Sequence, residues 1–143
     1  MSVIRTCKTC GRKNRIPAVH LADTGRCGAC KASLPPVDEP LEVDAASFDE
    51  IVQNSRVPVL ADFWAEWCGP CRAIGPVIAE LSKEYDGRVN VGKVNVDHNP
   101  QVSMNYGITS IPAILFIKDG KVVDKMIGVQ SKSNFVKRIE SHI

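Results

Sequence analysis

The sequence lacks any apolar run long enough to cross a membrane. Its longest apolar stretches, around Val57–Ala61 and Ile111–Ile117, fall far short of the roughly 18 residues that a transmembrane helix needs, so we expect no membrane partner. The first residues also lack the apolar stretch of a secretory signal, which predicts a cytoplasmic protein without structural disulfides. No Gly-x-Gly-x-x-Gly pattern occurs either, and we therefore expect no bound nicotinamide or flavin.

Aromatic residues and cysteines are scarce. Aromatics make up 6% of the 143 residues, and the six cysteines are too few for a disulfide scaffold, in which cysteine reaches roughly 8–10%. Hydrophobic residues reach 44% and charged residues 24%, which is typical of a globular protein. The length predicts one ordinary domain, or one domain with a small appendage.

Acidic residues are nearly absent from the first quarter of the chain. Residues 1–36 contain seven of the 18 lysines and arginines but only one acid, Asp23, so this segment is basic and the remainder is acidic. A basic segment can bind nucleic acid. Because no aromatic residue lies among these bases to stack on nucleotides, we expect no nucleic-acid partner.

The first four cysteines form two Cys-x-x-Cys pairs separated by 16 residues: Cys7, Cys10, Cys27 and Cys30. This spacing allows two tight turns to offer four thiolates to one tetrahedral zinc ion, and Gly11 and Gly28 suit such turns. A segment this short needs a metal to fold. Four cysteines complete a closed structural site, so we expect His20 to be a surface residue. The alternative is four free or disulfide-paired cysteines.

Strand and helix signals alternate after residue 40. Prolines between Ala32 and Pro40 disfavour a helix or a central strand, and we expect a zinc module over residues 1–36, a linker over 37–40 and a larger domain over 41–143. Hydrophobic patterns predict strands over 41–43, 57–65, 89–96, 112–117 and 122–127, with helices starting near Asp44, the third cysteine pair, a cap at Asn99, and Ser131. Asp119-Gly120 predicts a hairpin turn. The order βαβαβαββα predicts an α/β domain around a mixed sheet.

The third cysteine pair, Cys68 and Cys71, lies where a buried strand meets a helix. A helix N-terminus stabilises a thiolate, so Cys68 is the expected attacking sulfur and Cys71, one turn further, the resolving one. A metal-binding pair is the alternative. It would need two more ligands, and the domain has no further cysteine and no suitably placed histidine, since His98 follows a strand and His142 is terminal.

Asp62 is the one charged residue within the apolar run that precedes this pair. Burial of a carboxylate raises its pKa, which would allow Asp62 to accept the Cys71 proton, directly or through water. The alternative is an aspartate that faces solvent at the end of the strand.

Several separated motifs carry a family resemblance: Trp67-Cys68-Gly69-Pro70-Cys71, Ile111-Pro112 and Lys118-Asp119-Gly120. Together with Asp62, Lys93 and Gly128, they make residues 41–143 closely similar to thioredoxins, and the four-cysteine segment resembles that of zinc-containing bacterial members. The resemblance implies a thioredoxin fold, in which helices flank a central mixed sheet, preceded by a zinc-ribbon-like module with four cysteine ligands.

The resemblance also implies roles for particular residues. Lys93 would pair with Asp62, although a solvated lysine is the alternative, and Pro112 would follow a cis peptide bond, where a trans proline is the alternative. Trp67, Gly69 and Pro70 would form the active-site turn. The implied substrate platform consists of Trp67, Ile111, Pro112, Gly128 and Val129, although Trp67 could also be merely packed.

These observations predict a monomeric protein-disulfide reductase that carries one structural zinc ion. Its partners would be oxidised proteins and an NADPH-dependent thioredoxin reductase that resets the dithiol. One alternative is a zinc-dependent binding adaptor or holdase, but a mere scaffold needs no dithiol. Another is a redox sensor in which oxidation of the module's cysteines releases zinc.

Overall fold

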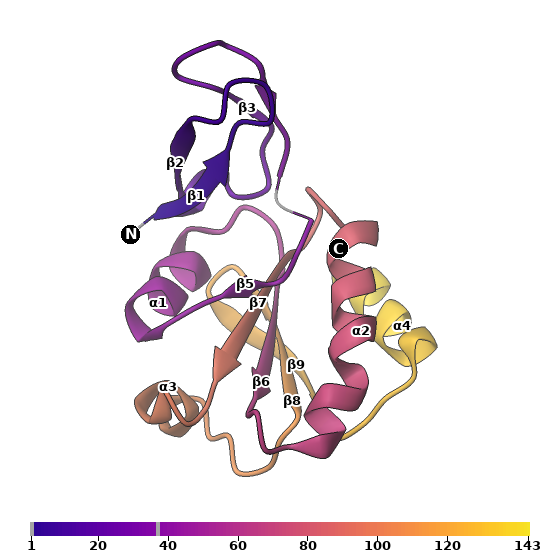
Figure 1. Cartoon of the computed structure of the whole chain (residues 1–143). Helices are drawn as coiled ribbons and strands as arrows, with labels where there is room; N and C mark the ends of the chain where they lie inside the picture. Colours follow the sequence, from indigo (N-terminus) through magenta and orange to yellow (C-terminus); the bar gives the residue numbers. More distant parts are fainter. Residues whose placement is uncertain (1, 37) are drawn as a thin grey trace.

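The computed structural model describes residues 2–36 and 38–143; Val37, in the predicted linker, and Met1 lie outside the described residues. Within these ranges the strands form two small two-stranded sheets and one five-stranded sheet. Figure 1 shows the two small sheets together at one end of the larger sheet. No helix in the described part of the chain is long and apolar enough to cross a membrane.

Two short hairpins build the N-terminal module. Strands β1 (Ser2–Thr6) and β2 (Lys13–Pro17) pair antiparallel, as do β3 (Gly25–Arg26) and β4 (Ser33–Leu34), and a 3-10 helix, η1 (Ala18–His20), follows β2. Strand β4 lies in the proline-rich stretch where the sequence disfavoured a helix or a central strand; it belongs to a two-stranded sheet and is not a central strand. A two-residue strand has no hydrophobic period to detect, and it ends before Pro35, where a ladder donor would be missing.

The five-stranded sheet has the order β5-β7-β6-β8-β9. Strands β5, β7 and β6 run parallel, while β8 runs antiparallel to β6 and β9 antiparallel to β8. The strand bounds are Leu41–Glu42 for β5, Val59–Trp64 for β6, Asn90–Asn95 for β7, Ala113–Lys118 for β8 and Lys121–Ile127 for β9. The predicted order of elements and the mixed sheet are therefore confirmed.

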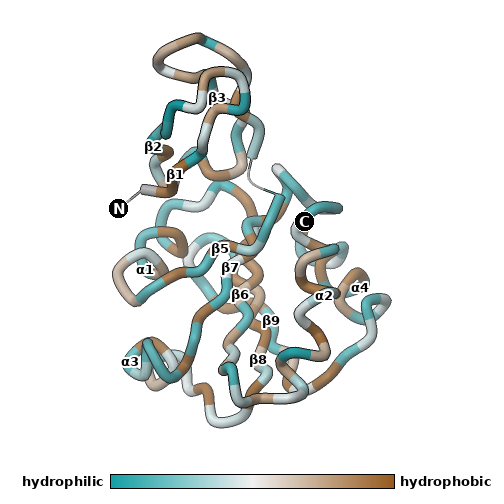
Figure 2. The backbone as a smooth tube through the Cα atoms, in the orientation of Figure 1, coloured by the Kyte–Doolittle hydropathy of each residue, from teal (hydrophilic) through white to brown (hydrophobic). Residues whose placement is uncertain are grey.

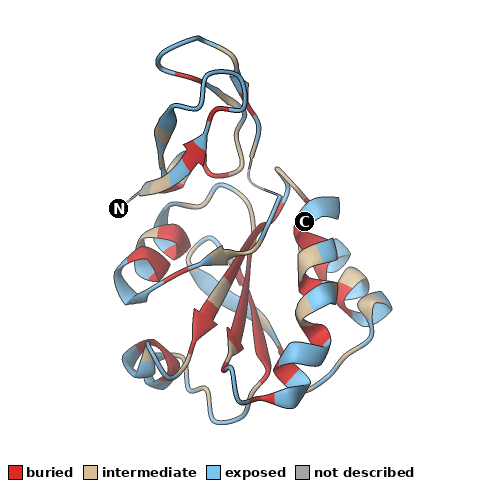
Figure 3. Cartoon of the chain, in the orientation of Figure 1, coloured by how far each residue is buried: buried red, intermediate tan, exposed pale blue. Residues whose placement is uncertain are grey.

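Two helices cover each face of this sheet (Figure 1). One face packs against α1 (Ala45–Asn54) and α3 (Pro100–Asn105), and the other packs against α2 (Gly69–Glu84) and α4 (Lys132–His142). Two separate apolar clusters result, one on each face of the sheet. Figure 2 shows apolar residues interrupted by polar ones along the central strands, and Figure 3 shows that these strands are the most continuously buried segments.

The helix starts follow ordinary capping chemistry with one exception. Asp44 forms a capping box with Ser47, and Ser131 accepts a hydrogen bond from the backbone of α4. Asn99 precedes α3 as predicted, but its side chain makes no capping hydrogen bond there. It donates instead to the carbonyl oxygen of Asn95, 3.1 Å away. A local backbone acceptor thus competes with the helix for this side chain.

The N-terminal module shares apolar core with the larger domain. Ala18 and Leu21 of the module belong to the same buried cluster as Phe48 and Ile51 of α1. An ion pair of 3.6 Å between Asp23 and Arg56 crosses the same junction. The module is therefore packed onto the larger domain, at the end of the sheet opposite the start of α2 (Figure 1).

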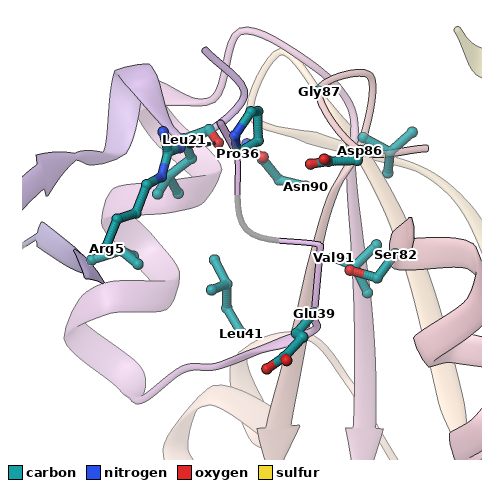
Figure 4. Close-up of a pocket in the computed structure, with 12 residues that line it drawn as sticks. Arg5, Leu21, Pro36, Glu39, Leu41, Ser82, Asp86, Gly87, Asn90 and Val91 are labelled. Carbon is teal, nitrogen blue, oxygen red and sulfur yellow. Dashed lines mark hydrogen bonds between the residues drawn. The ribbon is translucent and has the colours of Figure 1, made fainter. Parts of the chain in front are cut away.

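Arg5 organises the module from inside. Its side chain is 5% exposed, and its guanidinium donates hydrogen bonds to four backbone carbonyl oxygens, those of His20, Leu21, Asp23 and Leu34. These carbonyls belong to the segment after β2 and to β4, so one cation ties both hairpins together. Figure 4 shows Arg5 and Leu21 beside a small pocket whose opposite wall includes Asp86 and Gly87 of the larger domain.

Candidate functional site

Cys68 and Cys71 lie where the connection after β6 enters α2. They form a disulfide, and both residues are only 4% exposed. Cys68 is the N-cap residue of α2, and its sulfur accepts a hydrogen bond of 3.2 Å from the backbone N–H of Cys71. In the reduced protein this N–H and the positive end of the helix dipole would stabilise a thiolate on Cys68.

Asp62 is buried on the face of β6 that α2 covers. Alternate residues of a strand share a face, and Leu60, two positions earlier, packs in the cluster with Ile74 and Ile78 of α2. Asp62 is 1% exposed, and its Oδ1 has no hydrogen-bond partner. Burial raises the pKa of Asp62 to about 7; Lys93 acts to lower this pKa, and Glu42 acts to raise it. A carboxyl group with this pKa can hold or release a proton near neutral pH.

Lys93 lies on β7 directly opposite Asp62 in the strand register. Its ammonium sits over the Trp64 ring, 4.2 Å from the ring centroid. Among the ion pairs of the described residues, none joins Lys93 to Asp62 within 4.0 Å. Lys93 therefore lies beside Asp62 on the neighbouring strand, and its ammonium interacts with an aromatic ring.

The expected substrate platform has exposed apolar residues in the segments next to the disulfide. Trp67 is 69% exposed and Val129 is 57% exposed, while Ile111 packs against the cluster that contains Cys68 and Cys71. The Ile111–Pro112 peptide bond is cis. The N–H of Gly128 donates to the carbonyl oxygen of Pro112 at 2.9 Å, which holds the two loops of the expected platform together. Gly69 and Pro70 are both exposed at the start of α2.

Asp97 holds Trp67 in place. The indole Nε1 donates to a carboxylate oxygen of Asp97 at 2.8 Å, across 30 residues of sequence. No role for Asp97 was predicted from the sequence. Buried Ala65 and half-buried Val96, which pack beside the disulfide, were not singled out. Ala65 ends an apolar run and Val96 belongs to an alternating strand pattern, so both look like ordinary core residues.

The four cysteines of the N-terminal module converge on one point. Their sulfur atoms all lie within 4.8 Å of one another, and the pairs Cys7–Cys30 and Cys10–Cys27 are 3.6 Å apart. Four sulfurs at about 2.3 Å from a tetrahedral zinc ion would be roughly 3.8 Å apart, so the arrangement fits the metal. Hydrogen bonds from the backbone of Cys30 and Ala29 lower the pKa of Cys27 to about 6, which favours its thiolate.

Matching backbone turns present the two cysteine pairs. Cys7 N–H donates to the carbonyl of Arg12, and Cys27 N–H donates to the carbonyl of Ala32, each at 2.8 Å. The fifth position of each turn has positive φ, 77° at Gly11 and 64° at Lys31. Gly28, which the sequence suggested for this purpose, does not have positive φ; its N–H donates to the side chain of Asn14.

His20 lies outside the sulfur cluster. Its side chain is exposed and is 2.8 Å from the Asp23 carboxylate. The group of possible metal ligands among the described residues consists of the four cysteines alone. The predicted closed four-sulfur site is therefore consistent with the geometry.

Known protein families match both the N-terminal module and the larger domain. A thioredoxin family model matches residues 39–141, and a model described as thioredoxin 2, N-terminal, matches residues 6–32. The chain is 45% identical to thioredoxin 1 of Nostoc sp. over 71% of its length and 95% of that protein. It is 47% identical to a thioredoxin of Chlorobaculum thiosulfatiphilum over 71% of its length and 94% of that protein.

A solved structure supports the fold. A mutant thioredoxin from Halobacterium salinarum matches with a TM-score of 0.68 and 35% sequence identity, covering 73% of this chain and 91% of that one. The disulfide at the start of α2 fits a redox-active site, and the sulfur cluster fits the zinc ribbon of the second family model. The chain therefore belongs to the thioredoxin family of thiol–disulfide oxidoreductases and carries the zinc ribbon of the thioredoxin 2 type.

Proposed function

We propose that the protein reduces disulfides in other proteins, with Cys68 as the attacking thiolate and Cys71 as the resolving thiol. The observation that carries this assignment is the position of Cys68 at the N-cap of α2, where its sulfur accepts the Cys71 N–H. The exposed Trp67 beside it gives a protein substrate an apolar surface to contact.

The reaction transfers two electrons in two exchange steps. The Cys68 thiolate attacks one sulfur of the substrate disulfide, forms a mixed disulfide and releases the first substrate thiolate. Cys71 then loses its proton to Asp62 and attacks the Cys68 sulfur, which breaks the mixed disulfide and releases the second substrate thiolate. The chain is left with the Cys68–Cys71 disulfide, the form seen in this structure.

The surface around the disulfide suits an extended substrate. Ile111 precedes Pro112, which has no N–H. The backbone groups of Ile111 can therefore pair with a substrate strand without competition from a neighbouring N–H. Trp67, Val129 and Gly128 would contact the substrate's side chains. Lys93 would adjust the acidity of Asp62 from the neighbouring strand.

The oxidised protein needs an external source of two electrons. We propose that an NADPH-dependent thioredoxin reductase supplies them and returns Cys68 and Cys71 to the dithiol form. The zinc ion, held by the four cysteines of the module over residues 1–36, would be structural and separate from these steps. Zinc bound by four thiolates suits a reducing compartment, and we therefore propose that the protein acts in the cytoplasm. We also propose that it acts as a monomer.

NADPH-coupled reduction of a protein disulfide, in the presence of a bacterial thioredoxin reductase, tests this proposal. Wild type should turn over, Cys68→Ser should not, and Cys71→Ser should stop after one mixed disulfide. Val123→Ala, a change at an exposed position of β9, is the matched control and should keep full activity. A zinc-loaded wild type that shows no turnover would favour the adaptor function instead.

A second role for the module is favoured by the exposure of Cys10 and Cys30. Oxidants can reach these two sulfurs, and oxidation would release zinc and loosen the module. Zinc release should then track peroxide dose and precede any loss of reductase activity. Retained zinc at peroxide concentrations that inactivate the dithiol would exclude this sensor role.

A further inference from the structure

Three charged residues occupy neighbouring positions across three parallel strands. Glu42 of β5 lies opposite Lys93 of β7, and Lys93 lies opposite Asp62 of β6. Residues that pair directly in parallel strands point to the same face of the sheet. With strands roughly 4.8 Å apart, the row Glu42–Lys93–Asp62 places two carboxylates about 10 Å from each other on either side of one lysine.

The ammonium of Lys93 lies over an aromatic ring rather than against either carboxylate. The ring is that of Trp64, which shares the face of β6 with Asp62. Among the described residues, no ion pair within 4.0 Å joins Lys93 to Asp62 or to Glu42. The positive charge of Lys93 therefore acts on both acids through space, and Glu42 acts on Asp62 in the opposite sense.

Few other charged groups face Asp62. The strand on its other side, β8, presents Ile114, and the helix α2 above it presents the Cys68–Cys71 pair, which does not titrate while it is a disulfide. Glu42 itself is exposed, and the titratable groups that line the same open pocket are Asp44 and His98. The charges on β5 and β7 are thus the ones that act on the buried carboxyl group.

We propose that Glu42 is a positioning residue for the Asp62 proton: from the opposite side of Lys93 in the sheet, its carboxylate offsets the positive charge that Lys93 exerts on the buried Asp62 carboxyl group. The proposal rests on the role given above to Asp62 as the group that takes the Cys71 proton. The buried Asp62 has a raised pKa, and Glu42 contributes to this in the same direction as burial, against Lys93. Glu42 was not recognised in the sequence, where a single glutamate in a two-residue strand carries no signal.

The direct test is a titration of the Asp62 carboxyl carbon by NMR in the oxidised full-length, zinc-loaded protein. In this form neither active-site sulfur titrates. Glu42→Gln should lower the pKa of Asp62 by about 0.3 at low salt, as expected for two charges roughly 10 Å apart in water. Glu42→Lys should lower it about twice as far, and Glu42→Asp should leave it near the wild-type value. Lys93→Met should shift it in the opposite direction.

A charge effect must also respond to salt and to position. The shift caused by Glu42→Gln should shrink when the salt concentration is raised to about 1 M, because screening then acts within roughly 3 Å. Asp49→Asn removes the same charge from an exposed position on α1, on the other face of the sheet, and should leave the Asp62 titration unchanged. His98→Gln, combined with Glu42→Gln, should leave the shift as it is in the single variant.

The outcomes separate this proposal from the function on which it rests. An unchanged Asp62 pKa in Glu42→Gln, or an equal shift in Asp49→Asn, would overturn the role of Glu42. If the pKa moves as expected, the pH at which resolution by Cys71 is half-maximal should move by the same amount in the reduced protein. A pKa that moves while this kinetic midpoint stays fixed would support the charge row and overturn the role of Asp62 as proton acceptor.

Discussion

Asp62 combines two effects of one buried carboxyl group. Its pKa is raised by burial to about 7, so close to neutral pH it can accept a proton, but its ionised form is poorly solvated. The residue that we propose as the acceptor of the Cys71 proton is therefore also expected to destabilise the fold when it is ionised. The effect on stability and the effect on the reaction of Cys71 both depend on pH, and both can be measured by comparing wild type with Asp62→Asn.

The first prediction concerns stability. Between about pH 4, where an unfolded aspartate titrates, and pH 7, the native chain holds a proton that the unfolded chain has lost. Stability from Asp62 is complete below this range and is lost as pH rises through 7. Asp62→Asn should therefore raise the free energy of unfolding at pH 8 by roughly 2–4 kcal/mol, and by much less at pH 4. Denaturant unfolding at both pH values measures this.

The second prediction concerns the rate of resolution. The mixed disulfide of wild type should be resolved faster as pH rises through 7, because the Asp62 carboxylate becomes available. Asp62→Asn should slow the step about 10²-fold near pH 7, within the range typical of general base catalysis. Rapid-quench kinetics on a preformed mixed disulfide follow this step, and identical pH profiles for the two proteins would exclude the role.

The third prediction uses the two matching turns of the zinc ribbon. Lys31 has φ of 64° where the other turn has glycine, Gly11, at 77°. A left-handed conformation costs a residue with a side chain about 1 kcal/mol, so Lys31→Gly should stabilise the zinc-bound protein by roughly 0.5–1 kcal/mol. Gly11→Ala should have the opposite sign. Thermal unfolding of the zinc-loaded proteins compares them, and destabilisation by Lys31→Gly would contradict the prediction.

At the scale of the elements, periodicity and capping residues predicted most of what forms. Strand β6 is a nearly continuous apolar run, and it is the central strand, buried on both faces. The turn at Asp119 and Gly120 has positive φ at both residues, as a tight hairpin between right-twisted strands requires. These features depend on neighbouring residues and are therefore visible in the sequence.

Features that depend on distant residues were not visible. Strand β4 exists because β3 pairs with it, and the ammonium of Lys93 lies over Trp64 because a neighbouring strand brings that ring within reach. The hydrogen bond between Trp67 and Asp97 likewise joins two separate loops. The convergence of the first four cysteines and the burial of Asp62 could be predicted because their chemistry limits where such residues lie. Their exact partners required the fold.

The zinc ribbon lies on the far side of the molecule from the disulfide, yet it shares the core of the larger domain. Ala18 and Leu21 pack with α1, and Gly87 closely approaches the module: a Cβ built there would lie 3.4 Å from the carbonyl oxygen of Ala22. Unfolding of the ribbon would expose this shared apolar surface. We therefore expect the ribbon to support the stability of the larger domain.

The fourth prediction is that zinc binding stabilises the larger domain through the contacts between this domain and the zinc ribbon. Removal of zinc with a chelator should lower the melting temperature of the whole chain, including the signal from Trp64 and Trp67 of the larger domain. Two separate transitions, with the tryptophan signal unchanged by the chelator, would show that the ribbon and the larger domain unfold independently.

A matched pair of glycine variants tests the junction itself. Gly87 has φ of 81° and faces the module, whereas Gly107 has φ of 65° and has no neighbour within 4 Å of an added Cβ. Both Gly87→Val and Gly107→Val should introduce backbone strain. In the zinc-bound protein, Gly87→Val should lower the free energy of unfolding by about 1 kcal/mol more than Gly107→Val, because the added side chain is overpacked against the module. After zinc removal this difference should shrink. Equal costs in both forms would mean that the junction does not carry the coupling.

The different roles of Cys68 and Cys71 can be separated by trapping the mixed disulfide. The reduced, zinc-loaded Cys71→Ser protein is mixed with an oxidised protein substrate, and the trapped disulfide is located by peptide mass spectrometry. A stable adduct should form on Cys68, and no comparable adduct should form on Cys71 when Cys68→Ser is treated in the same way. An adduct that forms on Cys71 in Cys68→Ser, or only on the cysteines of the zinc ribbon, would contradict these roles.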